Sequence, residues 1–225
     1  MKTALVFANQ GTIDFSEVRS NVIRIPEVVA TLKEAQICID QICPNPVDLI
    51  SFMSADDTRF WSTEKFRKLC VGLVQIGLCR RYYKSKEPAD VLVCAEDVYS
   101  PVKVLTSTIS LKEYVELCLF QQDSNEVFQL SSGVLPQKLE AYKLTDEGYK
   151  VLIEKQDDVE SMIVQLREDH AIGRVINVGP CNTLVSSYAD PVLFSDMQVE
   201  ELINMDPMLT WFWDSMSRDL QGIAN

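Results

Sequence analysis

Three short apolar runs, each followed by a tight polar turn, most constrain how this chain can fold. Residues 4–7, 90–94 and 175–178 form these runs, and each gives way to small and polar residues. Longer stretches with helical spacing separate them, a pattern typical of a parallel sheet covered by helices. Ligands of such sheets bind beyond the carboxyl ends of the strands, so we expect the three turns to face one crevice.

The stretches between the runs predict helices, and one segment predicts a hairpin. Apolar residues recur at helical spacing from residue 25 to 42, and Pro44 and Pro46 bar continuation of that helix. Residues 139–144 and 149–153 flank a Thr-Asp-Glu-Gly turn, which predicts a β-hairpin. Further helices are expected over residues 47–53, 63–83, 109–117, 159–167 and, in the aromatic-rich tail, 199–220.

Two motifs give the chain a family resemblance. Residues 7–12 read Phe-Ala-Asn-Gln-Gly-Thr, and residues 178–180 read Val-Gly-Pro, followed by Leu184. In this order and spacing they resemble the opening and late motifs of malonyl-CoA:acyl carrier protein transacylases. The resemblance implies an α/β fold with an acyltransferase or α/β-hydrolase-like core, formed by residues 1–225 as a single domain. The family also has a small ferredoxin-like subdomain, and the resemblance implies that this subdomain is reduced or missing here. Residues 123–155 would form a reduced insert or hairpin in its place.

The resemblance fails at the residues that transacylase chemistry needs. An ungapped alignment puts Glu96 at the position of the family's nucleophilic serine, between Cys94 and Val98 instead of the glycines that a strained nucleophile elbow prefers. Gln121 stands where the family arginine pairs with the malonyl carboxylate, and a neutral amide cannot replace a bidentate guanidinium. The single histidine, His170, does not match the family's catalytic base. These differences predict a pseudoenzyme of the acyl carrier protein S-malonyltransferase family.

Some family positions could still take part in binding or altered chemistry. Gln10 matches the glutamine beside the oxyanion hole, with the backbone N–H of Asp97 as the second donor. Glu96 could bond to Gln10 and fill the pocket, or it could activate water as the general base of a thioester hydrolase. Cys94 and Cys181 are alternative nucleophiles, although neither has a visible base.

The net charge and the placement of basic residues limit the kinds of partner that the chain can bind. The net charge of −12 excludes a nucleic-acid-binding surface of the usual kind, because phosphate recognition needs concentrated basic residues. Against this acidic background, Arg80, Arg81, Lys84 and Lys86 end the helix before residue 90. They are explained either as a helix end stabilised by its dipole or as a docking patch for an acidic acyl carrier protein.

The remaining features describe the setting that we expect. No membrane span or export signal is visible, so we place the chain in the cytoplasm, where its seven cysteines stay reduced. No metal-ligand spacing occurs, and no cofactor is expected. The interpretation is a binding or scaffold partner in fatty acid or polyketide biosynthesis, as a monomer or as a homo- or hetero-oligomer. The alternatives are a thioester hydrolase, a transferase of a non-malonyl acyl group, and a binder of an unrelated small molecule.

Overall fold

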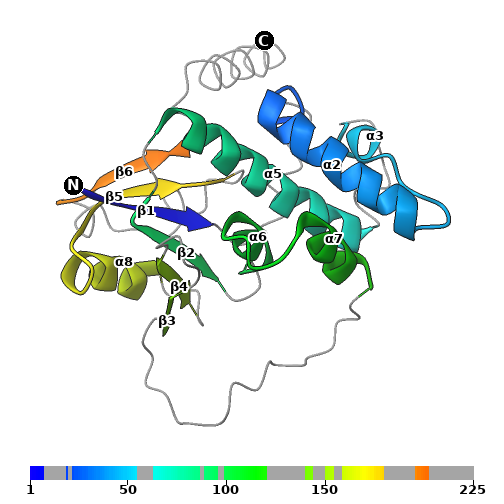
Figure 1. Ribbon diagram of the computed structural model, residues 1–225. Coiled ribbons are helices and arrows are strands. Elements are labelled where there is room, and N and C mark those ends of the chain that lie inside the picture. Colours follow the sequence, from blue (N-terminus) through cyan, green and yellow to red (C-terminus); the bar gives the residue numbers. More distant parts are fainter. Residues whose placement is uncertain are drawn as a thin grey trace, which may run out of the picture.

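The computed structural model describes residues 1–7, 19, 22–54, 63–86, 89–95, 99–120, 140–143, 150–154, 159–179 and 196–202. Within these residues one six-stranded sheet runs through the middle of the molecule (Figure 1). Its strands are β1 (Lys2–Phe7), β2 (Val91–Ala95), β3 (Glu140–Lys143), β4 (Lys150–Glu154), β5 (Ile172–Asn177) and β6 (Gln198–Glu201). They lie side by side in the order β3-β4-β2-β1-β5-β6.

The sheet is parallel except at one edge. β1 pairs in parallel with β2 on one side and with β5 on the other, while β4 continues the parallel sheet beyond β2 and β6 continues it beyond β5. Only β3, among the described strands, runs antiparallel, against β4. This arrangement confirms the predicted parallel sheet and the three strands read from the apolar runs.

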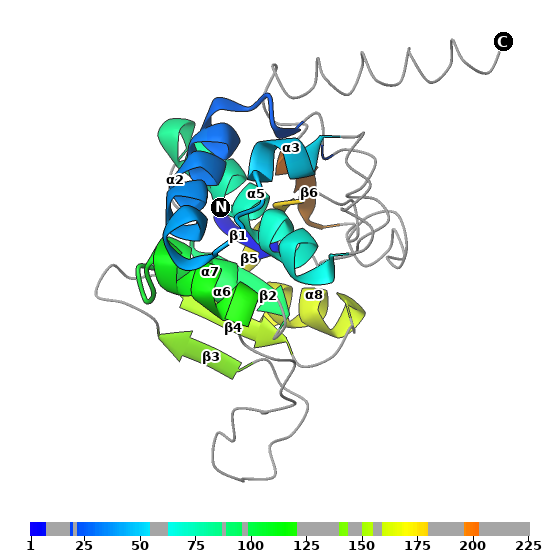
Figure 2. The same ribbon diagram turned by 90° about the vertical axis from the view of Figure 1, so that its right-hand side faces the viewer.

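Helices cover both faces of the sheet (Figures 1 and 2). The described helices are α2 (Pro26–Ile42), α3 (Leu49–Met53), α5 (Glu64–Ser85), α6 (Tyr99–Leu105), α7 (Leu111–Phe120) and α8 (Val159–Glu168). The five helices that follow β1 or β2 in the chain, α2 to α7, pack together on one face, where the larger apolar core lies. α8 packs on the opposite face through Ile163 and Leu166, against Val6, Val93 and Val175 of the sheet.

α5 is the central helix of the larger core. Its residues from Leu69 to Cys79 are all buried. Two glycines let neighbouring elements approach it closely: a Cβ on Gly77 would lie 2.6 Å from Val28 Cα of α2, and one on Gly72 would overlap the Tyr114 hydroxyl of α7. α5 therefore packs against the backbone of α2 at Gly77 and against the Tyr114 side chain of α7 at Gly72.

Helix ends follow local sequence signals. α2 starts with Pro26 in its first turn and stops before the two prolines, as predicted. Asp48 caps α3 by accepting a hydrogen bond from Ser51 N at 2.8 Å. Ser110 and Glu113 form a reciprocal capping box at the start of α7, with Ser110 N donating to Glu113 Oε2 at 2.7 Å and Glu113 N donating to Ser110 Oγ at 3.1 Å.

The middle and the tail differ in part from expectation. β3 and β4 form the predicted hairpin, with Glu140 opposite Ile153 and Lys143 opposite Lys150. β4 is also hydrogen-bonded to β2, so the hairpin extends the main sheet. The helix expected over residues 199–220 is wrong at its start, because residues 198–201 form β6 beside β5; residues 203–220 lie outside the described part.

Candidate functional site

The carboxyl ends of β1, β2 and β5 lie side by side. Phe7 is paired with Cys94, and Val6 with Asn177, so the chain leaves all three strands at the same edge of the sheet. This confirms that the three predicted turns begin at a common edge. β2, the next strand in the chain, lies on one side of β1, and the later strand β5 lies on the other side. The strand order therefore reverses direction between β1 and β5, and this is the topological switch point of the sheet.

The exit from β5 is held by three hydrogen bonds. Val178 N donates to Val6 O at 2.9 Å, which prolongs the β1–β5 pairing by one step. Gly179 has a φ of 77°, a left-handed conformation that glycine adopts at little cost, and its N donates to Asn177 Oδ1 at 3.3 Å. The Gly179 carbonyl accepts a bond of 3.1 Å from Nε2 of Gln75, which lies in the middle of α5.

Sequence reasoning missed Gln75. Its signal is a single amide within the apolar sequence Val-Gly-Leu-Val-Gln-Ile-Gly of a helix that is otherwise buried there. Because a buried polar group is costly unless it is hydrogen-bonded, such a residue points to a partner on another element. That partner, 104 residues away, is the turn after β5.

The predicted elbow lies between a strand and a helix, as expected. β2 ends at Ala95 and α6 begins at Tyr99. Glu96 and Asp97 fall between these two elements in the sequence, and they lie outside the described residues, as do Gln10 and Gln121. Their roles remain predictions.

Burial sets the state of the cysteines that the structure describes. Cys94 is 1% exposed within the sheet and packs in the core on the α2–α5 face, which does not favour it as an alternative nucleophile. Burial raises the pKa of the Cys70 and Cys79 thiols, and it raises that of Cys118 to about 11, so these side chains stay protonated at neutral pH. The six described cysteines are all free thiols, and Cys181 lies outside this part.

The basic cluster at the end of α5 is bound to α2. Arg81 Nη1 and Lys84 Nζ bind the two carboxylate oxygens of Glu27 at 3.0 and 2.9 Å. Arg80 Nη1 binds Glu34 Oε2 at 2.8 Å and Thr31 Oγ1 at 3.0 Å. Burial acts to raise the pKa of Glu27, but the hydrogen bonds from Lys84 and Arg81 outweigh it and lower the pKa to about 2.

The cluster also lies far from the shared carboxyl edge. α5 ends at Ser85 and β2 begins at Val91, so Arg80, Arg81 and Lys84 are near the amino end of β2. The ion pairs explain these three cations as a contact between α2 and α5. Lys86, the C-cap residue, is exposed, and docking of a partner on this cluster remains an untested prediction.

His170 is also at the amino edge. It follows α8 and precedes the first residue of β5 by two positions, and its backbone oxygen accepts from Lys2 Nζ at 3.5 Å. β5 spans roughly 17 Å at about 3.3 Å per residue, so its length separates His170 from Gly179. The only histidine of the chain is therefore not at the edge where the three turns begin.

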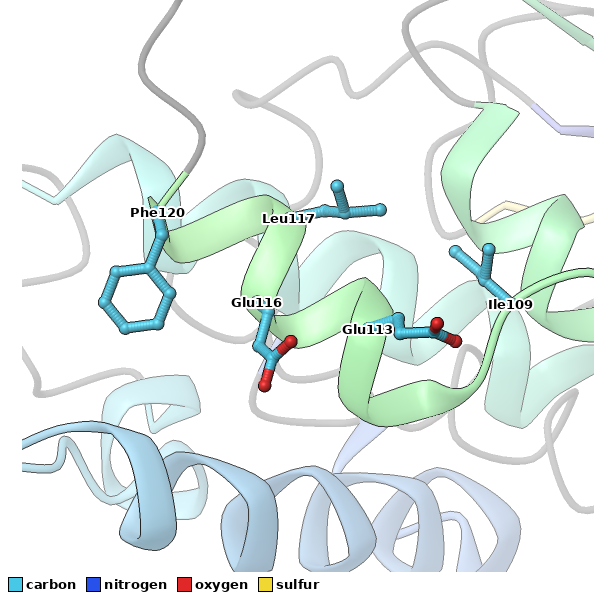
Figure 3. Close-up of a pocket in the computed structure, with 5 residues that line it drawn as sticks. All are labelled: Ile109, Glu113, Glu116, Leu117 and Phe120. Carbon is cyan, nitrogen blue, oxygen red and sulfur yellow. The ribbon is translucent and has the colours of Figure 1, made fainter.

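A shallow hollow of about 460 Å³ lies along α7 (Figure 3). Hydrogen bonds from Ser110 lower the pKa of Glu113, which therefore stays ionised and is not a proton donor near neutral pH. Glu116 Oε1 forms an ion pair with Lys112 Nζ at 3.9 Å. No nucleophile is among the residues described as lining the hollow, which are Ile109, Glu113, Glu116, Leu117 and Phe120.

Comparison with known proteins identifies structures of similar fold but no related sequence. No family model matches the sequence, and no curated protein matches it. Among solved structures, the chain is similar to a malonyl CoA-acyl carrier protein transacylase from Clostridium perfringens, with a TM-score of 0.56 and 10% identity over 100% of this chain and 99% of that one. The chain therefore shares the α/β fold of that protein.

A second match is partial. It is MCAT from Streptococcus pneumoniae, with a TM-score of 0.43 and 17% identity. The matched region covers 52% of this chain and spans only 36% of that protein. None of the helices in the described residues is both long and apolar enough to cross a membrane.

Proposed function

We propose that this chain is a pseudoenzyme with an acyltransferase fold, which binds a partner of fatty acid or polyketide assembly without transferring malonyl groups. The partner chemistry is a thioester of phosphopantetheine, the group shared by coenzyme A and acyl carrier protein. One observation carries the proposal: the connection between β2 and α6, where the fold would need its nucleophile, has the sequence Glu96-Asp97-Val98.

Charge and the position of the histidine support the loss of transfer. A carboxylate at residue 96 would repel the malonyl carboxylate, and in a crevice of reduced dielectric that repulsion amounts to several kcal/mol. Gln121 does not supply the compensating positive charge. His170, at the amino edge of the sheet, is not placed to deprotonate a group beyond the carboxyl ends.

Intact-mass measurement tests the proposal. The wild-type protein is incubated with malonyl-CoA and, separately, with acetyl-CoA, and its mass is followed together with the release of free coenzyme A. We expect no mass gain and no release above the uncatalysed rate. A mass gain mapped to one side chain would overturn the proposal, and coenzyme A release without a mass gain would identify a thioester hydrolase instead.

The variant Glu96→Ser tests how much of the site has been lost. We expect it to show no measurable malonyl transfer, because a serine without a matching histidine and arginine lacks both its base and its carboxylate ligand. Glu96→Gln is the matched control for removal of the charge alone. Malonyl transfer by Glu96→Ser but not by Glu96→Gln would contradict the prediction.

A further inference from the structure

The side of α7 that faces away from the core carries a line of side chains, which we call the α7 stripe. It consists of the residues that line the shallow hollow, at positions 109, 113, 116, 117 and 120. Residues three and four positions apart lie along one side of a helix, and Figure 3 shows these five following α7 from just before its start to its last residue. From Glu113 to Phe120 the stripe is roughly 10 Å long, at 1.5 Å per residue.

The opposite side of α7 already packs in the core. Tyr114 and Val115 are 1% and 0% exposed and belong to the larger apolar core. Leu117 and Phe120 belong to neither core cluster of the described residues, and Phe120 is 57% exposed. α7 therefore has apolar side chains that the packing of the described elements does not use. Exposed apolar side chains gathered around a hollow are typical of a surface that binds another protein.

The two carboxylates of the stripe determine the charge of the partner. Ser110 N and Oγ both donate to Oε2 of Glu113, and no hydrogen bond within the described residues reaches its Oε1. These bonds lower the pKa of Glu113, which is therefore ionised at neutral pH. The Glu116 side chain is 42% exposed, and its ion pair with Lys112 is long. Cations of a partner can therefore reach both carboxylates.

The same charges disfavour two other occupants. A second copy of the chain, placed on this surface by a two-fold axis, would bring like carboxylates together, and each copy has a net charge of −12. An acyl carrier protein is acidic as well, so it would also be repelled here. A basic amphipathic helix, in contrast, presents apolar side chains at the spacing of the stripe, with Lys or Arg beside them.

We propose that the α7 stripe binds a basic amphipathic helix of a partner protein. Apolar side chains of that helix pack on Leu117 and Phe120, while its Lys or Arg residues pair with Glu113 and Glu116. This interaction goes beyond the proposed binding of a thioester and does not depend on it. It gives the chain a docking surface for a cationic partner.

Two designed peptides test the proposal. One is an amphipathic helix of about 14 residues made of Leu and Lys, and the other has Glu in place of every Lys. Each is titrated with the full-length protein, Kd is measured by fluorescence anisotropy, and the contact is located by amide chemical shifts. We expect the Lys peptide to bind with shifts concentrated on residues 109–120 and to bind more weakly as salt rises from about 50 to about 300 mM. The Glu peptide should not bind.

Paired substitutions separate the α7 stripe from the general negative charge of the chain. The double variant Glu113→Gln/Glu116→Gln removes two charges, and glutamine at position 113 can still cap α7. The control Glu64→Gln/Glu168→Gln also removes two charges, from exposed ion pairs on α5 and α8. We expect the first variant to raise Kd for the Lys peptide about fivefold, the loss expected for two exposed ion pairs, and the control to change it less than about twofold.

Phe120→Ala tests the apolar contact. Its matched control is Ile37→Ala on α2, because Ile37 is 61% exposed and Phe120 is 57% exposed. We expect Phe120→Ala to raise Kd about tenfold, since aromatic residues carry much of the binding energy of interfaces, and Ile37→Ala to leave it unchanged. Both variants should keep the wild-type melting temperature, because neither side chain is buried.

Four results would overturn the proposal. They are no binding of the Lys peptide, equal binding of the Glu peptide, equal weakening by the two charge-removing variants, and a Kd that Phe120→Ala leaves unchanged. A lower melting temperature of Phe120→Ala would show instead that the chain covers the stripe itself, and shifts that depend on protein concentration without peptide would assign the stripe to a second copy. None of these results bears on the proposed function, which the intact-mass measurement tests separately.

Discussion

At the scale of single residues, Gly77 determines how closely α2 and α5 approach. A Cβ at this position would lie 2.6 Å from Val28 Cα and 3.0 Å from Val28 N, and backbone atoms cannot move aside as a side chain can. We expect Gly77→Ala to lower the free energy of unfolding by about 1–3 kcal/mol, the usual cost of overpacking a close-packed core. Urea denaturation followed by circular dichroism measures this change.

Gly173 provides the matched control for Gly77. A Cβ there would meet Cγ and Sδ of Met1, the far part of a flexible side chain that is itself exposed. Gly173→Ala should therefore change the free energy of unfolding by less than about 0.5 kcal/mol. Equal losses in both variants would mean that the approach of α2 to α5 is not the cause.

At the scale of elements, α2 and α5 are joined by a charge network that titrates in acid. The pKa of Glu27 is about 2 in the folded protein and 4.5 ordinarily, so ionised Glu27 stabilises the fold above pH 4.5, and this contribution is lost as the pH falls toward 2. At about 1.4 kcal/mol per pKa unit, its upper limit is about 3 kcal/mol. We expect Glu27→Gln to be less stable than wild type at pH 7, with the difference shrinking below pH 4.5.

Thermal unfolding of the two proteins between pH 2.5 and 7 measures this difference. Glu64→Gln is the control, because the ion pair of Glu64 with Lys68, at 2.9 Å, is exposed, and its loss should have little effect on stability at any pH. A difference between Glu27→Gln and wild type that stays constant from pH 7 to pH 2.5 would contradict the assigned pKa.

Sequence patterns predicted the elements better than their partners. Alternation of apolar runs and helical stretches identified β1, β2 and β5 because those signals are local. The hairpin of β3 and β4 was predicted from its turn, but its pairing with β2 was not, since that depends on a distant strand. Residues 199–201 were predicted as the start of a helix, yet they belong to strand β6, which pairs with the edge of β5.

The candidate site was harder to predict for the same reason. Glu27 and Arg81 are 54 residues apart, and Gln75 and Gly179 are 104 apart, so neither contact has a local signal. The four cations in seven residues were interpreted either as a helix end stabilised by its dipole or as a docking patch, and neither interpretation anticipated that three of them pair with α2. Gln10, Glu96, Asp97 and Gln121 were placed by family resemblance alone.

At the scale of the whole molecule, the chain carries a net charge of −12, so an acidic carrier protein approaches against general repulsion. Within the basic cluster, Lys86 is exposed, and no ion pair joins it to another described residue. Arg81, in contrast, is bound to Glu27, and its side chain is only 22% exposed. If a carrier protein docks here, we expect Lys86→Glu to weaken its binding several-fold without changing the melting temperature.

Chemical-shift mapping with unlabelled acyl carrier protein checks this prediction. Shifts at Arg80, Arg81, Lys84 and Lys86 in wild type, reduced in Lys86→Glu, would support docking on the cluster. Lys103→Glu is a charge-matched control on α6, away from the end of α5. The absence of shifts at these four residues at saturating carrier protein would remove the docking patch and leave the cluster as a purely structural contact.

The placement of the hairpin has a consequence for anyone who wishes to shorten this protein. Because β4 is hydrogen-bonded along the whole of β2, cutting out residues 140–154 would expose a row of main-chain N–H and C=O groups on an inner strand. Such an exposed strand edge pairs readily with other chains, so the shortened protein would aggregate instead of folding as a smaller version of the full-length chain. A chimera that grafts a larger lobe between α7 and α8 should retain this strand.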